Sequence, residues 1–518
     1  MPSFKQAFLW VSAGRYSVTL IGVGTTVIMA RLLSPSEYGI SVIGTTVLLI
    51  ADAIRSLAGA SYLIRVKELS LDKIRTSCTI NFILTSAMTL TLLLLAPWIA
   101  SYYNDPVLEL YFYITGISYL IGPFSFQIGA LMTRDMAFDR LALISVVTAL
   151  VNAITGIVLA SLGFSALSYA WATVGGTAAS VLLSFYFYPS WSIFRPLLRE
   201  WRSVLGFGVF DGATTVLNRL TENLSYLILG RLLNVEAVGL VQRAFLLAGF
   251  PERVFLGGFG AVALPAFSEK ARQGHDLKHS YLRAVEYITA IQWPALMLVV
   301  FLAHPIVGVV LGQQWLAVVP LLQIFAGALM FNFPVGLEYP TLVAAGAIRY
   351  LPAIVMGQAT VFTLLWWLGT VTHGLYGGAV SMLVIVPVNV AISLLVVRSR
   401  VPFSWRELAR AMRKSVLLLG LSAVGPMILA LPSDWRAEVS IPAALFAAIL
   451  SGIGWAYGLR LTRHPLAQDV FSACDALLRG TVDIRALGAC VRLFGNSRQD
   501  TPEGAFKGNR TRRGDGNV

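Results

Sequence analysis

Long apolar runs recur along this chain, and most of them have the length that a helix needs to cross a membrane. A transmembrane helix takes about 20 apolar residues to span roughly 30 Å of hydrocarbon. Only 13% of the 518 residues are charged, whereas soluble proteins carry roughly 25%. The sequence therefore predicts an all-α polytopic membrane protein with about fourteen transmembrane helices. The runs lie near residues 8–30, 38–60, 78–100, 108–131, 141–162, 165–187, 206–230, 237–263, 284–303, 317–344, 351–371, 374–397, 414–431 and 440–459.

A short motif occurs twice and indicates an internal repeat. The segment RLLSPSEYG at 31–39 returns as RLLNVEAVG at 231–239, in each case after a long apolar run. We therefore expect two six-helix lobes with the same topology, and two extra helices at the C-terminal end. Parallel repeats of this kind are typical of transporters with a central cavity. The predicted parts are an N-terminal lobe over 1–188, a basic cytoplasmic linker over 189–205, a C-terminal lobe over 206–397, helices 13 and 14 over 398–460, and a cytoplasmic tail over 461–518 that is amphipathic and then disordered.

Basic residues gather in alternate loops, as expected of loops that remain in the cytoplasm. Both termini are therefore predicted to be cytoplasmic, and the net charge of +13 reflects membrane topology. We expect no nucleic-acid partner, because the basic residues form no module with interleaved aromatic side chains. The basic loops contain Arg65, Lys67, Lys73 and Arg75, then Arg134 and Arg140, then Arg195, Arg199 and Arg202, then Lys270, Arg272, Lys278 and Arg283, then Arg349, and then Arg398 through Lys414.

Cysteine and histidine residues provide neither a disulfide framework nor a metal site. Cys78 lies in the third apolar run while Cys474 and Cys490 lie in the tail, and His275 with His279 has helical spacing but no further ligands nearby. We expect no metal and no cofactor. A cleavable signal peptide is not expected either, because the first apolar run is too long and contains Arg15.

The run at 206–230 carries the richest set of polar residues at membrane depth. Asp211, Thr215, Arg219 and Glu222 are spaced four, four and three residues apart, and Asn218 lies beside them. This spacing places them on one helical face. Charged side chains in a membrane usually face a hydrated cavity or a partner. The stripe therefore predicts a cavity lining, and the alternative is that Arg219 and Glu222 only neutralise each other.

Other runs also contain isolated charges that are expensive to bury in a bilayer. Arg15 lies in the first run, where it is close enough to the cytoplasmic end to reach the interface. Asp52 and Arg55 lie three residues apart in the second run, so they either line the cavity or satisfy each other. In the eighth run, Arg243 is the stronger candidate, while Glu252 and Arg253 follow Pro251, where the helix should bend.

The tenth run is interrupted by polar and helix-breaking residues. Pro334 and Pro340 flank Glu338, and Asn332 precedes them. A broken membrane helix exposes backbone carbonyls that a cavity or packed helices must satisfy. Glu338 is therefore predicted to bind a proton or a cation that drives transport. The alternative is a carboxylate that caps a helix near the cytoplasmic rim.

The chain resembles the polysaccharide transporters of the multidrug, oligosaccharidyl-lipid, polysaccharide (MOP) flippase superfamily, which include the Wzx-type flippases. The resemblance rests on ARLLSPSEYG at Ala30–Gly39, on GRLLNVEAVGLVQRA at Gly230–Ala244 and on the helix plan, and it covers roughly residues 5 to 460. It implies a V-shaped, two-lobed bundle that moves an oligosaccharide on undecaprenyl pyrophosphate across the bacterial cytoplasmic membrane by alternating access. The implied pathway is the biosynthesis of exopolysaccharide or lipopolysaccharide.

The resemblance also implies roles for particular residues. Related lipid II flippases hold the pyrophosphate with cavity arginines on the first, second and eighth helices, and Arg15, Arg55 and Arg243 lie on those helices here. With these, we expect Arg219, Asn218 and Thr215 to contact substrate. Asp52, Asp211, Glu222 and Glu338 are the predicted sites of ion coupling. A polysaccharide polymerase and a chain-length regulator are the implied protein partners.

Two other functions fit the composition. A drug or metabolite exporter of the same superfamily would share the fold, but it would have a smaller and more apolar pocket. A polytopic polymerase or ligase would need a sizeable outer loop with catalytic residues. The predicted outer loops are short, at Ser101–Asp105, Gly163–Ser165 and Thr372–Gly374. We therefore expect a flippase rather than an enzyme.

Overall fold

The architecture is seen in a computed structural model of the chain, in which every regular element among the described residues is a helix. The structure describes residues 4–472 apart from 56–62, 65, 67–68, 200, 431–439 and 469. Most of the predicted tail, from 473 onward, lies outside the described residues. The predicted all-α membrane fold is confirmed.

The six helices of the N-terminal lobe coincide with the first six apolar runs. They are α1 (Phe4–Leu32), α2 (Pro35–Arg55), α4 (Leu71–Tyr103), α5 (Val107–Arg134), α6 (Phe138–Ser161) and α7 (Leu167–Phe187), followed by a short 3₁₀ helix, η2 (Trp191–Phe194). Among these helices, α1 packs on α6, and α7 packs on both α5 and α6.

The C-terminal half is more interrupted. Its elements are α8 (Trp201–Leu232), α9 (Val235–Ala248), the π-helical turn η3 (Glu252–Leu256), α10 (Gly257–Arg272), α11 (Leu277–Phe301), α12 (Ala303–Val310), η4 (Gln313–Trp315), α13 (Val318–Leu329), η5 (Met330–Asn332), α14 (Val335–Ala344), η6 (Ile348–Tyr350), α15 (Leu351–Arg400), α16 (Trp405–Ala430) and α17 (Ile441–Leu461). The predicted breaks after Pro251 and around Pro334 are both present, as η3 and η5.

The element α15 is a helical hairpin rather than one rod. Its backbone leaves the helical region at His373 and at Gly374, where φ is +63°. This turn separates the two predicted runs at 351–371 and 374–397, and a glycine adopts positive φ without strain. Each predicted run therefore coincides with helical residues over the part of it that the structure describes. Nine helices among the described residues are long and apolar enough to cross a membrane, and the full count of fourteen crossings stays a prediction.

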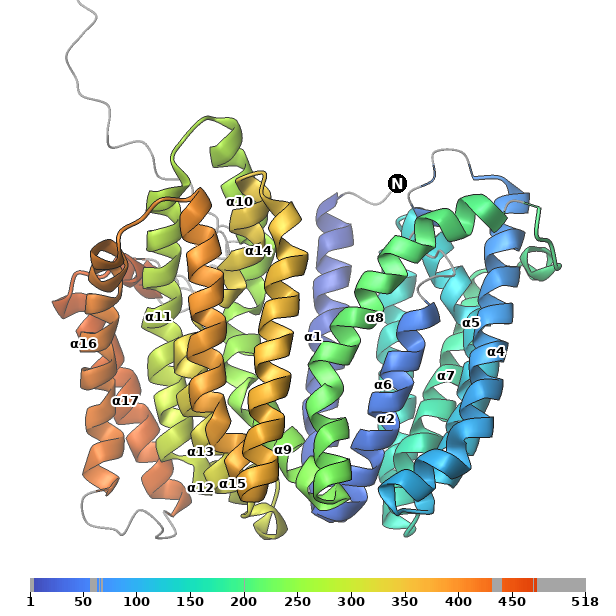
Figure 1. Ribbon diagram of the computed structural model, residues 1–518, viewed down its shortest axis with the longest axis horizontal. Coiled ribbons are helices and arrows are strands. Elements are labelled where there is room, and N and C mark those ends of the chain that lie inside the picture. Colours follow the sequence, from blue (N-terminus) through green and yellow to red (C-terminus); the bar gives the residue numbers. More distant parts are fainter. Residues whose placement is uncertain are drawn as a thin grey trace, which may run out of the picture.

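The two lobes lie side by side (Figure 1). Helix α8 packs on α2 and α4 of the N-terminal lobe and on α9 and α15 of the other half. The extra helices α16 and α17 pack on each other and on α11, at the edge far from the N-terminal lobe. Helix α1 begins at the opposite end of the bundle from the α1–α2 and α8–α9 turns (Figure 1). The exact lobe boundaries stay a prediction.

The two copies of the repeat motif meet where α2 crosses α9, and we call this end of the bundle the repeat end. A Cβ atom on Gly39 would lie 1.7 Å from the carbonyl oxygen of Val235, and one on Gly239 would lie 2.3 Å from that of Pro35. Real side chains never approach so closely, so this crossing requires glycine on both helices. The motif therefore joins the lobes through its own two copies.

The same motifs also begin the two crossing helices. Ser34 and Glu37 form a capping box, in which the Ser34 backbone N–H donates to the Glu37 carboxylate (2.8 Å) and the Glu37 N–H donates to the Ser34 hydroxyl (3.3 Å). Asn234 caps α9 by accepting from the Ala237 N–H at 2.8 Å. The repeat therefore encodes two helix starts as well as their crossing.

Candidate functional site

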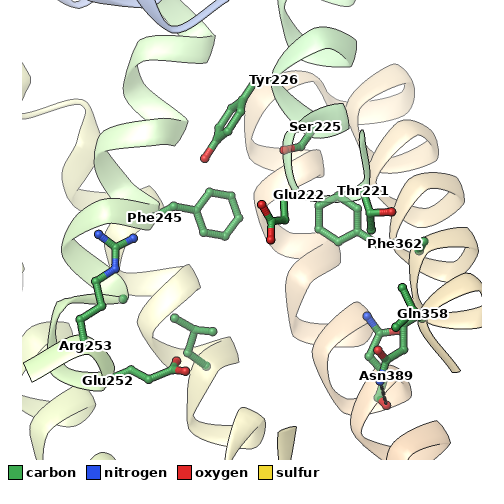
Figure 2. Close-up of a pocket in the computed structure, with 14 residues that line it drawn as sticks. Thr221, Glu222, Ser225, Tyr226, Phe245, Glu252, Arg253, Gln358, Phe362 and Asn389 are labelled. Atoms are coloured by element: carbon green, nitrogen blue, oxygen red, sulfur yellow. Dashed lines mark hydrogen bonds between the residues drawn. The ribbon is translucent and has the colours of Figure 1, made fainter. Parts of the chain in front are cut away.

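A cavity of about 500 Å³ opens between α8, α9, η3, α13 and α15. This volume lies within the range of about 300–1,000 Å³ that is usual for ligand pockets. Figure 2 shows side chains from several elements converging on it. Its lining consists of Thr221, Glu222, Ser225, Tyr226, Phe245, Gly249, Glu252, Arg253, Leu329, Val355, Gln358, Ala359, Phe362 and Asn389.

One wall of the cavity is the π-helical turn η3. The turn follows Pro251, which lacks the backbone N–H needed to continue an α-helical ladder. Glu252 and Arg253 come from this turn, and both line the cavity. The part of the chain that the structure describes contains no carboxylate within ion-pair distance of Arg253. π-Helical turns are frequent at functional sites, and this one brings a free guanidinium to the cavity.

Aromatic rings form a second part of the lining, and buried rings support them. Phe245 stacks on Phe325 with ring centroids 4.1 Å apart. Phe362 stacks on Trp366, whose ring is fully buried, at 5.6 Å. Stacking from behind restricts both lining rings, so the cavity presents them as rigid apolar faces.

The third part of the lining is polar and comes from both arms of α15. The Gln358 amide donates to the Asn389 backbone carbonyl at 3.2 Å and to the Glu338 carboxylate at 3.4 Å. Glu338 lies behind this wall and is only 6% exposed. The side-chain oxygens of Asn389 and Tyr281 are buried, and neither has a hydrogen-bond partner among the described residues. A buried carboxylate thus lies one side chain away from the cavity.

The predicted polar stripe of α8 contributes to the cavity in part. Glu222 lines it and points toward Phe245 (Figure 2). Arg219 lies outside the lining and pairs with Glu222 at 3.0 Å, as the alternative interpretation expected. Thr215 is half-buried and also lies outside the lining. The side chains of Asp211 and Asn218 lie outside the described residues.

Of the predicted residues of the first lobe, the two whose side chains the structure describes, Arg15 and Asp52, do not line this cavity. Arg15 is exposed on α1, and Asp52 is half-buried on α2. The side chain of Arg55 lies outside the described residues. The geometry of the described cavity is therefore set by α8 and the second half of the chain.

Arg243 lies away from the cavity, buried between the lobes near the repeat end. Its side chain is 2% exposed, and its guanidinium carbon lies 3.7 Å from the centre of the Tyr38 ring and 5.4 Å from that of Trp315. The Tyr38 hydroxyl donates to the Gln242 side chain at 2.6 Å. Among the described residues, the Nε and one terminal nitrogen of Arg243 have no hydrogen-bond partner. In this conformation Arg243 is part of the contact between lobes.

Sequence reasoning missed several lining residues. Gln358 and Asn389 are amides within strongly apolar runs, and this placement is a sequence signal by which they could have been found. The sequence places Glu252 and Arg253 directly after Pro251, where a bend is predicted, but it does not indicate that they line a cavity. Tyr226 and Phe245 give no sequence signal, because aromatic residues are common in packed membrane helices.

The sequence also matches a known protein family. Residues 28–320, more than half of the chain, match the family model described as polysaccharide biosynthesis protein. The chain belongs to this family.

Three bacterial proteins are similar to this chain in sequence. It is 25% identical to an uncharacterized membrane protein in the cps region of Klebsiella pneumoniae, over 74% of this chain and 80% of the relative. It is 25% identical to the lipopolysaccharide biosynthesis protein WzxC of Escherichia coli, over 60% and 63% of the two chains. It is 23% identical to the succinoglycan biosynthesis transport protein ExoT of Rhizobium meliloti, over 68% and 71%.

Two solved structures with the MOP fold superpose on this chain. The lipid II flippase MurJ, in an inward closed conformation, superposes with a TM-score of 0.67 at 13% identity, over 88% of this chain and 99% of MurJ. An inward-facing multidrug resistance MATE transporter of the MOP superfamily superposes with a TM-score of 0.61 at 15% identity, over 74% and 94%. The predicted two-lobed MOP fold is confirmed.

Proposed function

We propose that this protein is a flippase that moves an undecaprenyl-pyrophosphate-linked oligosaccharide across the bacterial inner membrane for polysaccharide biosynthesis. The observation that carries the proposal is the cavity beside α8, which offers a free guanidinium, hydrogen-bonding side chains and aromatic faces within a polysaccharide biosynthesis protein. The names of its relatives, which include a succinoglycan transport protein, support the same substrate class. The flippase has no catalytic residue to assign.

Arg253 is the residue that we assign to the pyrophosphate. A guanidinium makes charge-assisted, bidentate hydrogen bonds to phosphate oxygens, and Arg253 lines the cavity without a carboxylate within ion-pair distance among the described residues. The lipid tail would remain in the bilayer while the headgroup enters between the lobes. Rocking of the lobes would then expose the cavity to alternate sides of the membrane.

Glu338 is the residue that we assign to energy coupling. It is buried, and the described side chains that interact with its carboxylate, Gln358 and Ser393, are neutral. A buried carboxylate without a cation is costly unless it takes up a proton or binds a metal cation. Because Gln358 contacts both the cavity and Glu338, substrate and proton or cation binding would be linked. Asp52, Asp211 and Glu222 remain further proposals for coupling.

The remaining assignments concern the cellular setting. We place both termini in the cytoplasm because the basic loops alternate along the sequence. A polymerase and a chain-length regulator are the proposed partners, since they act on the translocated repeat unit. The roles proposed for the residues that line the cavity do not depend on these assignments.

The test is transbilayer movement of a fluorescent polyprenyl-pyrophosphate oligosaccharide in proteoliposomes, followed by lectin access from outside. We expect movement with the wild type and a decrease of about tenfold or more for Arg253→Gln, because one charge-assisted contact contributes about 1.5–3 kcal/mol. Arg272→Gln is the control, because Arg272 is exposed at the end of α10 and pairs with its helical neighbour Glu269. If well-folded wild type moves small cationic dyes but not the lipid-linked sugar, the protein is an exporter.

A further inference from the structure

The charge of the cavity does not match a site built only for pyrophosphate. Its lining contains one cation, Arg253, and two carboxylates, Glu222 and Glu252. Glu222 is already paired with Arg219 at 3.0 Å, whereas Glu252 forms no ion pair among the described residues. Each carboxylate repels a phosphate, and this repulsion is stronger in a partly desolvated site than in water. A large part of the cavity must therefore suit a different chemical group.

The wall opposite Arg253 offers the chemistry of sugar recognition. Figure 2 shows Arg253 and Glu252 on one side, and Gln358, Asn389, Phe362 and Thr221 on the other. Sugar rings have an apolar C–H face that packs on a flat aromatic ring, and hydroxyl groups that donate and accept at their edges. Amides, hydroxyls and carboxylates supply both kinds of partner. This wall combines a flat ring with all of these polar groups.

The aromatic rings of the cavity lining are held in place before a ligand arrives, and Phe362 is the ring that belongs to this wall. Phe362 is stacked on Trp366 with an interplanar angle of 9°, and Phe245 is stacked on Phe325 with an angle of 15°. The Asn389 side-chain oxygen is buried and has no hydrogen-bond partner in the part of the chain that the structure describes. A hydroxyl donor would satisfy this oxygen, which is costly to leave unpaired. The wall is thus preorganised and has an unfilled acceptor.

We infer that the wall formed by Thr221, Glu222, Phe362, Gln358 and Asn389 is a saccharide subsite, and that it favours neutral sugars over acidic ones. This inference rests on the proposed flippase function. A uronic acid bound there would bring its carboxylate next to that of Glu222 on the same wall, with the carboxylate of Glu252 across the cavity, whereas a neutral sugar would donate a hydroxyl to Glu222. Like charges that face each other in a site select against the charged ligand. The subsite thus restricts the repeat units that the protein accepts.

The experiment measures binding of three probes to the purified full chain in lipid nanodiscs by calorimetry. The probes are farnesyl pyrophosphate, a farnesyl-pyrophosphate disaccharide of neutral hexoses, and the same disaccharide with glucuronate in place of one hexose. For the wild type we expect the neutral disaccharide to bind about tenfold more tightly than the acidic one, which corresponds to about 1.4 kcal/mol. Farnesyl pyrophosphate should bind more weakly than the neutral disaccharide.

Two substitutions assign the effect to the subsite. Asn389→Leu should weaken the neutral disaccharide several-fold and leave farnesyl pyrophosphate unchanged, and Glu252→Gln should reduce the preference against glucuronate. Phe331→Leu is the control, because Phe331 is 50% exposed and lies outside the cavity lining. Each variant is first checked for wild-type thermal stability in the nanodisc. A variant that fails this check is replaced by Gln358→Leu, which tests the same wall.

The results separate the subsite from the proposed function. Equal or tighter binding of the acidic disaccharide overturns the inference, as does equal loss of all three probes in Asn389→Leu. In either case, movement of the lipid-linked sugar in proteoliposomes would leave the flippase function standing. If no probe binds and no movement occurs with folded wild type, the proposed function fails together with the subsite.

Discussion

The guanidinium carbon of Arg243 on α9 lies 3.7 Å from the centre of the Tyr38 ring on α2. This contact joins the two lobes a short distance from the crossing of Gly39 and Gly239. Trp315 also faces the guanidinium and donates to the Ala30 carbonyl at 2.7 Å, so η4 binds the end of α1 at the same place. A desolvated cation–π contact contributes about 2 kcal/mol. These contacts hold the repeat end closed.

The first prediction concerns this closure. Tyr38→Leu removes the ring beneath Arg243 and the hydrogen bond to Gln242, so the repeat end should open more often. Spin labels can be placed at Ser161 and His373, which are exposed on different lobes. Pulsed electron paramagnetic resonance should then show a larger population with a long distance between the two labels. Tyr113→Leu is the control, because Tyr113 is exposed and its hydroxyl donates to Glu109 on its own helix. An unchanged distance distribution in Tyr38→Leu would refute the role of this contact.

The second prediction concerns the glycine crossing. Gly39→Ala should lower the thermal unfolding temperature in detergent by several degrees, because the new methyl group would meet the Val235 backbone and overpacking costs about 1–3 kcal/mol. Gly239→Ala should act in the same direction against the Pro35 carbonyl. Gly22→Ala, with no atom within 4 Å of the new Cβ, should be neutral or slightly stabilising because alanine favours a helix. The same shift in all three variants would contradict this explanation.

The third prediction separates coupling from translocation. Glu338→Gln keeps the shape and the hydrogen bond from Gln358 but removes the titratable group. Movement of the lipid-linked sugar should then no longer respond to an imposed proton or sodium gradient, while exchange without a gradient should persist. Glu269→Gln, an exposed change at the end of α10, should retain the response. A gradient response in Glu338→Gln equal to that of the wild type would place coupling elsewhere.

The fourth prediction concerns pH and the segment that follows α17. Burial lowers the pKa of His464 from 6.5 to about 4, although the Glu286 carboxylate 3.7 Å away favours the charged form and Lys414 opposes it. Leu466, which is 7% exposed, packs with Tyr287 and Leu418 next to this histidine. Because the docked histidine is neutral, docking is strongest above pH 6.5 and weakens as the pH falls from 6.5 toward 4.

Hydrogen exchange of residues 462–468 checks this dependence. Protection should be lower at pH 5 than at pH 8, after correction for the intrinsic exchange rates. His464→Gln, which cannot take up a proton, should show less of this difference. Protection that does not change with pH in the wild type would contradict the prediction.

The sequence was sufficient for the features that depend on local chemistry. Each apolar run reports its own tendency to form a membrane helix, so the runs, the break at Pro251 and the turn at His373 and Gly374 were predictable one segment at a time. The repeat at 31–39 and 231–239 predicted two related lobes, because it could be seen without knowing any contact. Glu222 was predicted to line a cavity for a similar reason, since helical spacing alone defines the face on which it lies.

Only the tertiary structure decided which distant residues meet. The face of a helix that turns toward a neighbour depends on packing between lobes, and helical spacing does not contain this information. Arg243 has the residue type of a phosphate ligand, yet packing places it against Tyr38 and Trp315. Gln358 and Asn389 come together because α15 folds back on itself. The sequence alone determined the helices, the repeat and the family resemblance, whereas packing of the lobes decided which polar groups share the cavity.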